Sequence, residues 1–377
     1  MKKLLILGAG QMQVPIIALA KQLGHYTIVA DYDPKAPGFE YADVKSTIST
    51  IDKEAVLELA KSEQVDGILT TSDYPVRVVA YVSEKLGLPS MSQKVAEVCT
   101  DKYQQRLLFK EHGINTPFFV QCDTNTDLTS FKDFPYIVKP VDSSASRGVE
   151  RVNTAEQLSK AVEIACDLSR SGKAIVESFI GGKEFSVETL TQQGITHIIQ
   201  ITEKLTRGED KGCFVEDTHI EPARISEDDA IEIREEVLKA AKAVGVDNCP
   251  THTEIKLWDG KPYIIEMACR LGGDYITSDL VPLSTGISML ENLIRLSLGE
   301  KIDFEVKYSK WSCVQFLNEA NYYRCQDFIN KGDKHIRSSE VGVYKDRVIK
   351  SSLDRLGYVI LQSDTRGDIE DILAMIK

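Results

Sequence analysis

Two glutamates in neighbouring apolar runs are the residues of this sequence best suited to chemistry. Glu254 lies in the run HTEIKL, Glu266 lies in the run YIIEMA, and Asp259-Gly260 is the turn expected between them. A turn of this kind makes the two runs antiparallel strands, so both carboxylates project to the same side. Converging carboxylates repel unless a cation lies between them, and a hard cation with oxygen ligands meets that need. The pattern therefore predicts a magnesium site rather than two solvated glutamates, because apolar residues surround Glu266.

A cation and two glycines follow the second glutamate. Arg270 lies four residues beyond Glu266 and shortly before Gly272-Gly273. Glycines allow the backbone to approach a ligand closely, and a guanidinium can hold a phosphoryl group or a carboxylate with two parallel hydrogen bonds. We expect Arg270 beside the reacting groups.

A lysine and a small-residue loop form a second candidate site. Lys139 ends the apolar run PYIVK, and the loop from Asp142 to Gly148 follows it at once. A lysine at a strand end can reach into a cleft, and a polar, flexible loop can fold over phosphates. Taken alone, these residues are better explained by a lysine at a strand end beside an ordinary surface loop.

Two further glutamates flank a turn in VESFIGGKEFSVE. Glu177 and Glu184 can meet at the mouth of one cleft, where their carboxylates could accept hydrogen bonds from an adenine amino group and ribose hydroxyls. The alternative is a solvated strand face.

The first loop resembles a dinucleotide fingerprint. Gly8-Ala9-Gly10 lies between a strand and a helix, and Asp31 ends the next strand. However, Gln13 occupies the place of the third glycine. A nicotinamide-dependent oxidoreductase is therefore an alternative that leaves Lys139, Glu254 and Glu266 unexplained.

Composition excludes several classes of protein. The net charge is -12 and no basic run interleaves with aromatic residues, so nucleic acid is a poor partner. The apolar stretch before Gly8 is too short for a signal peptide or a membrane span. Eight scattered cysteines, none in a CxxC pair, argue against disulfides and zinc, which fits a cytoplasmic protein.

The order of elements predicts three units. Residues 1–100 alternate strands and helices as a parallel α/β unit, and residues 101–300 mix helices with hairpin-like strands as an α+β unit. Residues 301–377 contain short strand candidates and a final helix from Gly367.

The ordered set of motifs resembles the ATP-grasp superfamily across essentially the whole chain. The motifs are Asp101-Lys102, the IVKP lysine, the small-residue loop, VESFIGGKEFSVE, HTE and IIEMACRLGG. The resemblance implies a Rossmann-like opening domain, a two-lobed ATP-grasp domain and a small C-terminal β-rich domain. It also implies an ADP-forming ligase that activates a carboxylate as an acyl phosphate and delivers it to an amine, with ATP and Mg²⁺ as cofactors and Mn²⁺ as a second candidate metal.

The resemblance assigns a role to each candidate residue. Glu254 and Glu266 would ligate the metal. The implied catalytic residues are Arg270, which would steady the transferred phosphoryl group and the acyl phosphate, and Lys139, which would contact the ATP phosphates. Many relatives have asparagine two residues after the second glutamate, where this chain has Ala268, so the second metal position is open. The implied ATP-binding residues are Lys102, Lys139, Ser143, Ser144, Ser146, Gly148, Glu177, Ile180 and Glu184, and the implied substrate-side residues are Glu216, His219, His252, Arg270, Gly272 and Gly273.

Two subfamilies compete within this resemblance. The opening GAGQMQ is similar to carboxyaminoimidazole ribonucleotide synthetase, which phosphorylates bicarbonate, whereas the segment from Glu203 through Phe214 to Ala223, together with HTEIKLWDG, is more similar to amino-acid ligases and to the large subunit of carbamoyl phosphate synthetase. We favour the second, with small-molecule carboxylate and amine substrates and no membrane or nucleic-acid partner. A homodimer is expected because relatives are frequently dimers. A non-catalytic, regulatory ATP-binding protein is a further alternative.

Overall fold

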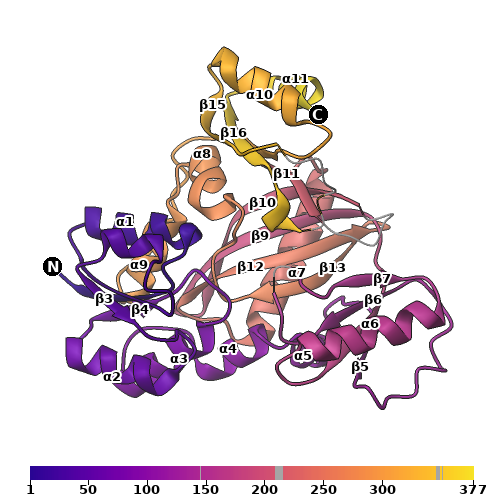
Figure 1. Ribbon diagram of the computed structural model, residues 1–377, viewed down its shortest axis with the longest axis horizontal. Coiled ribbons are helices and arrows are strands. Elements are labelled where there is room, and N and C mark those ends of the chain that lie inside the picture. Colours follow the sequence, from indigo (N-terminus) through magenta and orange to yellow (C-terminus); the bar gives the residue numbers. More distant parts are fainter. Residues whose placement is uncertain (145, 209–214, 345–348, 350) are drawn as a thin grey trace.

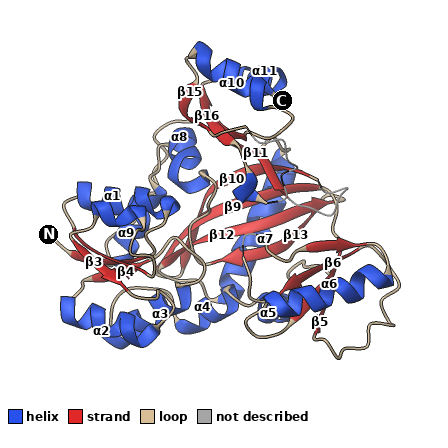
Figure 2. Ribbon diagram, viewed as in Figure 1, coloured by secondary structure: helices blue, strands red, loops and turns tan. Residues whose placement is uncertain are grey.

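The computed structural model describes residues 1–144, 146–208, 215–344, 349 and 351–377, and it contains three sheets flanked by helices (Figure 1; Figure 2). Ala145 of the loop from Asp142 to Gly148, the cysteine Cys213, and Phe214 lie outside these ranges. In the described part of the chain, no helix is long and apolar enough to cross a membrane.

The first sheet is parallel and buried on both faces. Its strands are β1 (Lys3–Leu7), β2 (Tyr26–Asp31), β3 (Val44–Thr47) and β4 (Gly67–Leu69), in the order β3-β2-β1-β4. Leu4 and Ile6 share a core with helices α1 (Val14–Gln22) and α9 (Met289–Ser297), whereas Leu5 and Leu7 pack with α2 (Lys53–Glu63) and α3 (Val76–Leu86). Burial on both faces requires the continuous apolar run KLLIL.

The second sheet is antiparallel and small. Its strands are β5 (Phe119–Cys122), β8 (Ala174–Ser178), β6 (Tyr136–Pro140) and β7 (Glu150–Val152), in that spatial order. Helix α6 (Ala155–Leu168) packs on it through residues such as Leu158 and Val162, because its apolar positions recur at helical spacing. Helices α4 (Gln93–Cys99) and α5 (Lys102–Glu111) precede this sheet, and Asp101 caps α5.

The third sheet has eight antiparallel strands in the order β13-β12-β9-β10-β11-β14-β16-β15. Helix α7 (Glu227–Val244) covers one face of its first half, as Figure 1 shows. The strands of this half are β9 (Lys183–Gln192), β10 (Ile195–Arg207), β11 (Val215–Glu221), β12 (Cys249–Trp258) and β13 (Lys261–Ala268).

The C-terminal strands continue this third sheet instead of forming a separate one. Strand β14 (Trp311–Phe316) pairs with β11, and β16 (Gly357–Ser363) and β15 (Ile336–Val341) follow outward. Helices α10 (Tyr322–Lys331) and α11 (Arg366–Ile376) pack on them through a core that includes Phe328 and Ile372. The unit boundaries at residues 100 and 300 stay a prediction.

The connection after β13 is irregular. A π-helix (Ile276–Leu280) continues into α8 (Val281–Thr285). Asp274 and Tyr275, which precede it, both have positive φ, +51° and +66°. Such φ values are uncommon for residues other than glycine and concentrate at functional sites.

Candidate functional site

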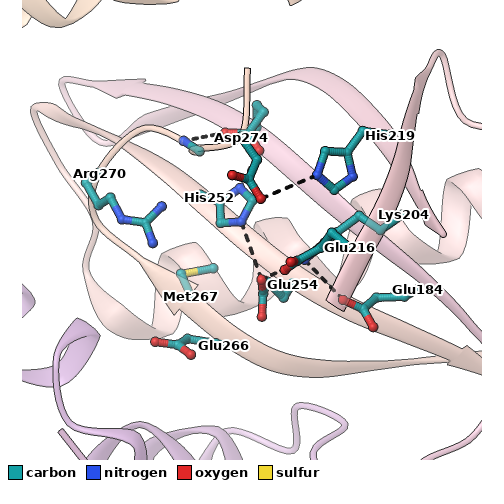
Figure 3. A network of polar contacts seen from close by, with 12 residues as sticks. Glu184, Lys204, Glu216, His219, His252, Glu254, Glu266, Met267, Arg270 and Asp274 are labelled. Carbon is teal, nitrogen blue, oxygen red and sulfur yellow. Dashed lines mark hydrogen bonds and ion pairs between the residues drawn. The ribbon is translucent and has the colours of Figure 1, made fainter. Parts of the chain in front are cut away.

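The predicted metal pair is present as two facing carboxylates. Glu254 on β12 is the cross-strand partner of Glu266 on β13, and both side chains are roughly a quarter exposed. Figure 3 shows them on the same side of the sheet. Burial raises the pKa of the Glu254 carboxyl, but the charges of Lys204 and His252 outweigh burial and hold that pKa well below its ordinary value. The Glu254 carboxyl is therefore ionised, which a metal ligand of this kind requires.

Lys204 on β10 is a functional candidate that the sequence analysis did not select. Its Nζ lies 2.8 Å from Glu254, 3.1 Å from Glu184 and 3.8 Å from Glu216. Burial lowers the pKa of this ammonium, and the three carboxylates raise it well above its ordinary value. A permanently charged, buried lysine among carboxylates is suited to meet phosphate. The only sequence signal was its place in the Glu203-Lys204 segment.

Glu184, which the resemblance places at the ribose, lies between two lysines. Its carboxylate contacts Lys204 and also Lys256, whose Nζ is 3.1 Å away. Burial raises the pKa of Glu184, but these two cations lower it below the ordinary value. Ile180 lies half-buried in the turn that leads into β9.

Lys139 and Glu177 form a buried ion pair on adjacent strands of the second sheet. The Nζ of Lys139 is 2.8 Å from Glu177, and Arg106 Nε is 2.7 Å from the other carboxylate oxygen. Burial lowers the pKa of Lys139, and Glu177 opposes this only in part. The structure thus gives Glu177 the role of holding Lys139, and its contact with adenine stays a prediction.

Lys102 joins the predicted phosphate loop to the metal pair. Its Nζ donates to the Ser143 carbonyl at 2.6 Å and contacts Glu266 at 3.0 Å. Within the loop Ser143 is buried, Ser144 half-buried and Ser146 exposed. Gly148 has φ +73°, a backbone conformation that favours glycine, and a Cβ there would lie 2.8 Å from the Leu168 side chain.

Arg270 makes a bidentate ion pair with Asp73, which lies within residues 1–100. Its Nε and Nη2 donate to the two oxygens of Asp73 at 2.6 and 3.2 Å. Burial alone would lower the pKa of Arg270, but Asp73 raises it above the ordinary value. Asp73 follows β4 and was not selected from the sequence, although it ends the run VDGILTTSD. The pair positions the guanidinium of Arg270, with Nη1 bonded to the Leu271 carbonyl.

His252 bridges the metal pair and a buried acid. Its Nδ1 lies 2.5 Å from Glu188, and its Nε2 lies 3.7 Å from Glu254. Burial lowers the pKa of this imidazole, but Glu188 raises it more, to about 9, so the ring is charged at neutral pH. The Gly272 amide donates to Glu188 at 3.2 Å, and a Cβ at Gly272 would lie 2.7 Å from His252 Nδ1.

The other substrate-side candidates lie farther along the same face. Glu216 accepts a hydrogen bond from Arg355 at 3.0 Å, and His219 is fully buried with its Nε2 3.9 Å from Asp274. Gly273 has open space around it. Arg355 and Asp274 are additional residues of this cluster that the sequence analysis did not name.

The dinucleotide-like loop is closed by its own side chains. The Asp31 carboxylate accepts a 2.7 Å hydrogen bond from the Ala9 amide. The Gln13 side chain fills the space beside Gly8 and Gly10, because a Cβ added at either glycine would contact it. Asp31 thus caps the loop. This geometry disfavours the oxidoreductase alternative.

Comparison with known proteins agrees with this geometry. Residues 17–90 match the ATP-grasp N-terminal domain, and residues 132–279 match the ATP-grasp domain. D-alanine--D-alanine ligase of Neisseria meningitidis is 30% identical over 219 residues, 54% of this chain and 68% of that protein. The chain belongs to the ATP-grasp family.

Two other proteins show the range of relatives. Formate-dependent phosphoribosylglycinamide formyltransferase of Bacteroides thetaiotaomicron is 29% identical over 256 residues, 65% of either chain. The chain thus spans slightly less than two thirds of that relative. The crystal structure of an L-amino acid ligase from Bacillus licheniformis superposes with a TM-score of 0.82 at 24% identity. The superposition covers 100% of this chain and 98% of that one. This likeness shows the fold, which confirms the predicted fold class.

Proposed function

We propose that the protein is an ATP-dependent, ADP-forming ligase that phosphorylates a carboxylate and joins it to an amine. The observation that carries the proposal is the facing pair Glu254 and Glu266, with Lys102, Lys204 and Arg270 around it. This arrangement concentrates cations and metal ligands at one place in an acidic protein. Phosphoryl transfer requires that concentration.

The nucleotide would lie between the second and third sheets. Lys102 and Lys139 would contact phosphates, Glu184 the ribose, and Glu177 the adenine edge. The loop from Asp142 to Gly148 would close over the phosphates. The Glu177–Lys139 pair supports this placement, because it fixes the ammonium of Lys139 at the end of β6.

The carboxylates fit a magnesium ion. No group of three or more His, Cys, Asp or Glu side chains suited to a metal exists among the described residues, so Glu254 and Glu266 would share the ion with nucleotide phosphates and water. Magnesium usually binds in this way, through one or two carboxylates. When bound, it would neutralise phosphate charge, and Mn²⁺ has the same ligand preference. Ala268 offers no side-chain oxygen for a second ion.

The remaining residues supply positioning and electrostatics. A carboxylate is a poor electrophile, so attack of its oxygen on the γ-phosphorus of ATP, with release of ADP, converts it to an acyl phosphate. An amine then attacks the acyl carbon, and phosphate leaves. Arg270 and Lys204 would hold the transferred phosphoryl group, and the loop would exclude water, which otherwise hydrolyses the acyl phosphate.

Glu216, His219, His252, Gly272 and Gly273 would form the substrate side of the site. The bicarbonate-phosphorylating alternative and the regulatory alternative share the nucleotide half. The expectation of a homodimer rests on the family resemblance, and the expectation of a cytoplasmic location rests on the scattered cysteines.

A coupled assay for ADP tests the proposal. The wild-type protein is incubated with ATP, Mg²⁺ and a panel of carboxylates and amines, singly and in pairs. We expect ADP to require a carboxylate and to increase when an amine is added. ADP formed with bicarbonate alone supports the carboxylase alternative. Tight ATP binding without any ADP supports the regulatory alternative and rejects the ligase.

A further inference from the structure

Asp274 presents a carboxylate to the substrate side of the site without any assigned role. Its side chain is about one third exposed, and Figure 3 shows its carboxylate reaching toward His219. The backbone at Asp274 and Tyr275 is left-handed, with positive φ at both residues. Strain of this kind persists only where the surrounding structure fixes it.

Arg355 is one of the residues that fix Asp274. Its Nη2 donates to Asp274 Oδ2 at 2.9 Å and to Glu216 Oε2 at 3.0 Å, and the guanidinium lies 3.6 Å above the centre of the Phe316 ring. Burial raises the pKa of Asp274, but His219 and Arg355 outweigh it and keep that pKa well below its ordinary value. The carboxylate is therefore ionised and oriented.

Two carboxylates share this single guanidinium nitrogen. The next cation, Lys204, is 3.8 Å from Glu216 and already bonds Glu184 and Glu254. Asp274 Oδ1 accepts no hydrogen bond from the described residues. Negative charge and acceptor capacity are thus left over at Asp274.

His219 provides an independent sign that a ligand belongs here. The residue is fully buried, yet neither ring nitrogen has a hydrogen-bond partner among the residues that the structure describes. Its Nε2 lies 3.9 Å from Asp274, too far for a direct hydrogen bond. A neutral imidazole has one acceptor nitrogen, and a buried polar group without a partner is costly.

We propose that Asp274, with Glu216 and His219 behind it, is a subsite for a protonated amine of the substrate. An ammonium group has three donors and no acceptor, so it can donate to the free oxygen of Asp274 and to the acceptors beside it. The substrate class is then an α-amino acid or another cationic amine, in contrast to bicarbonate or formate. This inference rests on the proposed function and narrows it. The ammonium belongs either to the carboxylate substrate or to the acceptor.

The test compares Asp274→Asn with the wild type. Asparagine has the shape of aspartate and accepts left-handed backbone, so the fold is retained, as a thermal melt checks. Asp279→Asn is the matched control, because Asp279 lies in the same connection and is bonded by Ser278. Hydroxylamine traps the acyl phosphate as a hydroxamate, and it is mostly uncharged at neutral pH. Alanine and propionate, and phenylalanine and hydrocinnamate, are the matched carboxylates with and without an ammonium.

The two sources of the ammonium give different results. If the carboxylate substrate supplies it, the wild type forms hydroxamate from the amino acid about 10- to 100-fold more efficiently than from its deaminated partner, and Asp274→Asn removes that preference. If the acceptor supplies it, hydroxamate formation is unchanged in the variant, whereas joining to an amino-acid acceptor falls by a similar factor. Equal loss for all substrates, or no loss beyond that of Asp279→Asn, overturns the subsite.

Failure of the proposed function is visible separately. In that case the wild type yields neither ADP nor hydroxamate with any carboxylate. Calorimetric titration of alanine and propionate into the protein bound to magnesium and a non-hydrolysable ATP analogue then decides the subsite. Preferential binding of alanine that Asp274→Asn abolishes supports it, and equal binding of the two probes by the wild type rejects it.

Discussion

Glu254 and Glu266 face each other across β12 and β13, yet each bonds a lysine from a different part of the chain. Lys204, 2.8 Å from Glu254, comes from β10, and Lys102, 3.0 Å from Glu266, comes from the start of α5. The lysines offset the mutual repulsion of the carboxylates without a bound ion. They also leave ammonium groups where phosphate oxygens would arrive with a metal. The site would therefore offer an anionic nucleotide cations that are already in place.

Replacing Glu266 by glutamine tests the metal assignment. We expect Glu266→Gln to lower metal-dependent ADP formation roughly a hundredfold or more, because one charged ligand is lost at nearly constant volume. The melting temperature should change little. Titration of Mg²⁺ and Mn²⁺ at saturating ATP measures the effect. Exposed Glu305 provides the control variant Glu305→Gln, and near-normal turnover of Glu266→Gln would exclude the predicted ligand role.

Replacing Lys204 by methionine tests the role of the lysine that three carboxylates share. The variant leaves Glu184, Glu216 and Glu254 without their shared cation, and removal of one partner from a buried ion pair costs about 3–5 kcal/mol. We expect a lower free energy of unfolding and weaker ATP binding. Denaturant unfolding and nucleotide titration measure both, with Lys183→Met at an exposed position as the control. Unchanged stability would show that the three carboxylates do not depend on Lys204.

The hairpin that carries the metal pair was predictable because its information is local. The turn Asp259-Gly260, with φ of +51° and +69°, and the flanking apolar runs set the register near the turn, where Ile255 pairs with Ile264. The register then shifts by one residue between Glu254 and Ile255, and this irregularity, which the local pattern does not show, sets Glu254 opposite Glu266. The βαβ opening was also predictable, because the continuous apolar runs of its strands indicate burial directly. Sequence resemblance added the order of motifs.

Long-range partners could not be predicted in this way. Asp73 and Arg270 are 197 positions apart, and Arg355 reaches Glu216 over 139 positions. Nothing in the local pattern distinguishes such residues from surface charges, since their pairing is decided by how the sheets and helices pack. The pairing of β11 with β14, which joins the C-terminal strands to the large sheet, could not be predicted either, because it also depends on how distant segments pack.

Two adjacent glycines give a matched test of close packing. A Cβ at Gly272 would lie 2.7 Å from His252 Nδ1 and 2.9 Å from Glu188, whereas a Cβ at Gly273 would meet nothing within 4 Å. We expect Gly272→Ala to cost about 1–3 kcal/mol and to raise the KM for the carboxylate substrate, because it separates His252 from Glu188. Gly273→Ala should keep the wild-type free energy of unfolding, because nothing lies within 4 Å of the added Cβ. Equal effects of the two variants would show that the spacing at Gly272 is not critical.

Glu221 predicts a specific dependence of stability on pH. Its carboxyl is fully buried, accepts hydrogen bonds from Thr202 and Ser284 at 2.8 and 3.0 Å, and pairs with no cation among the described residues. Burial raises its pKa to about 8. The folded state therefore keeps a proton that the unfolded chain loses above the ordinary pKa of 4.5.

The sign of this effect follows from proton binding. The stabilising contribution of protonated Glu221 is complete below pH 4.5 and is lost as the pH rises toward 8, at about 1.4 kcal/mol per pH unit. Glu221→Gln cannot ionise at this position. Between pH 5 and pH 8 the free energy of unfolding of the wild type should therefore fall by about 4 kcal/mol relative to that of the variant. Urea unfolding of both proteins at several pH values measures the difference, with Glu58→Gln at an exposed position as the control. Parallel curves for Glu221→Gln and the wild type would mean that Glu221 is already ionised in the folded protein, and a cation or water would then have to reach it between β10 and β11.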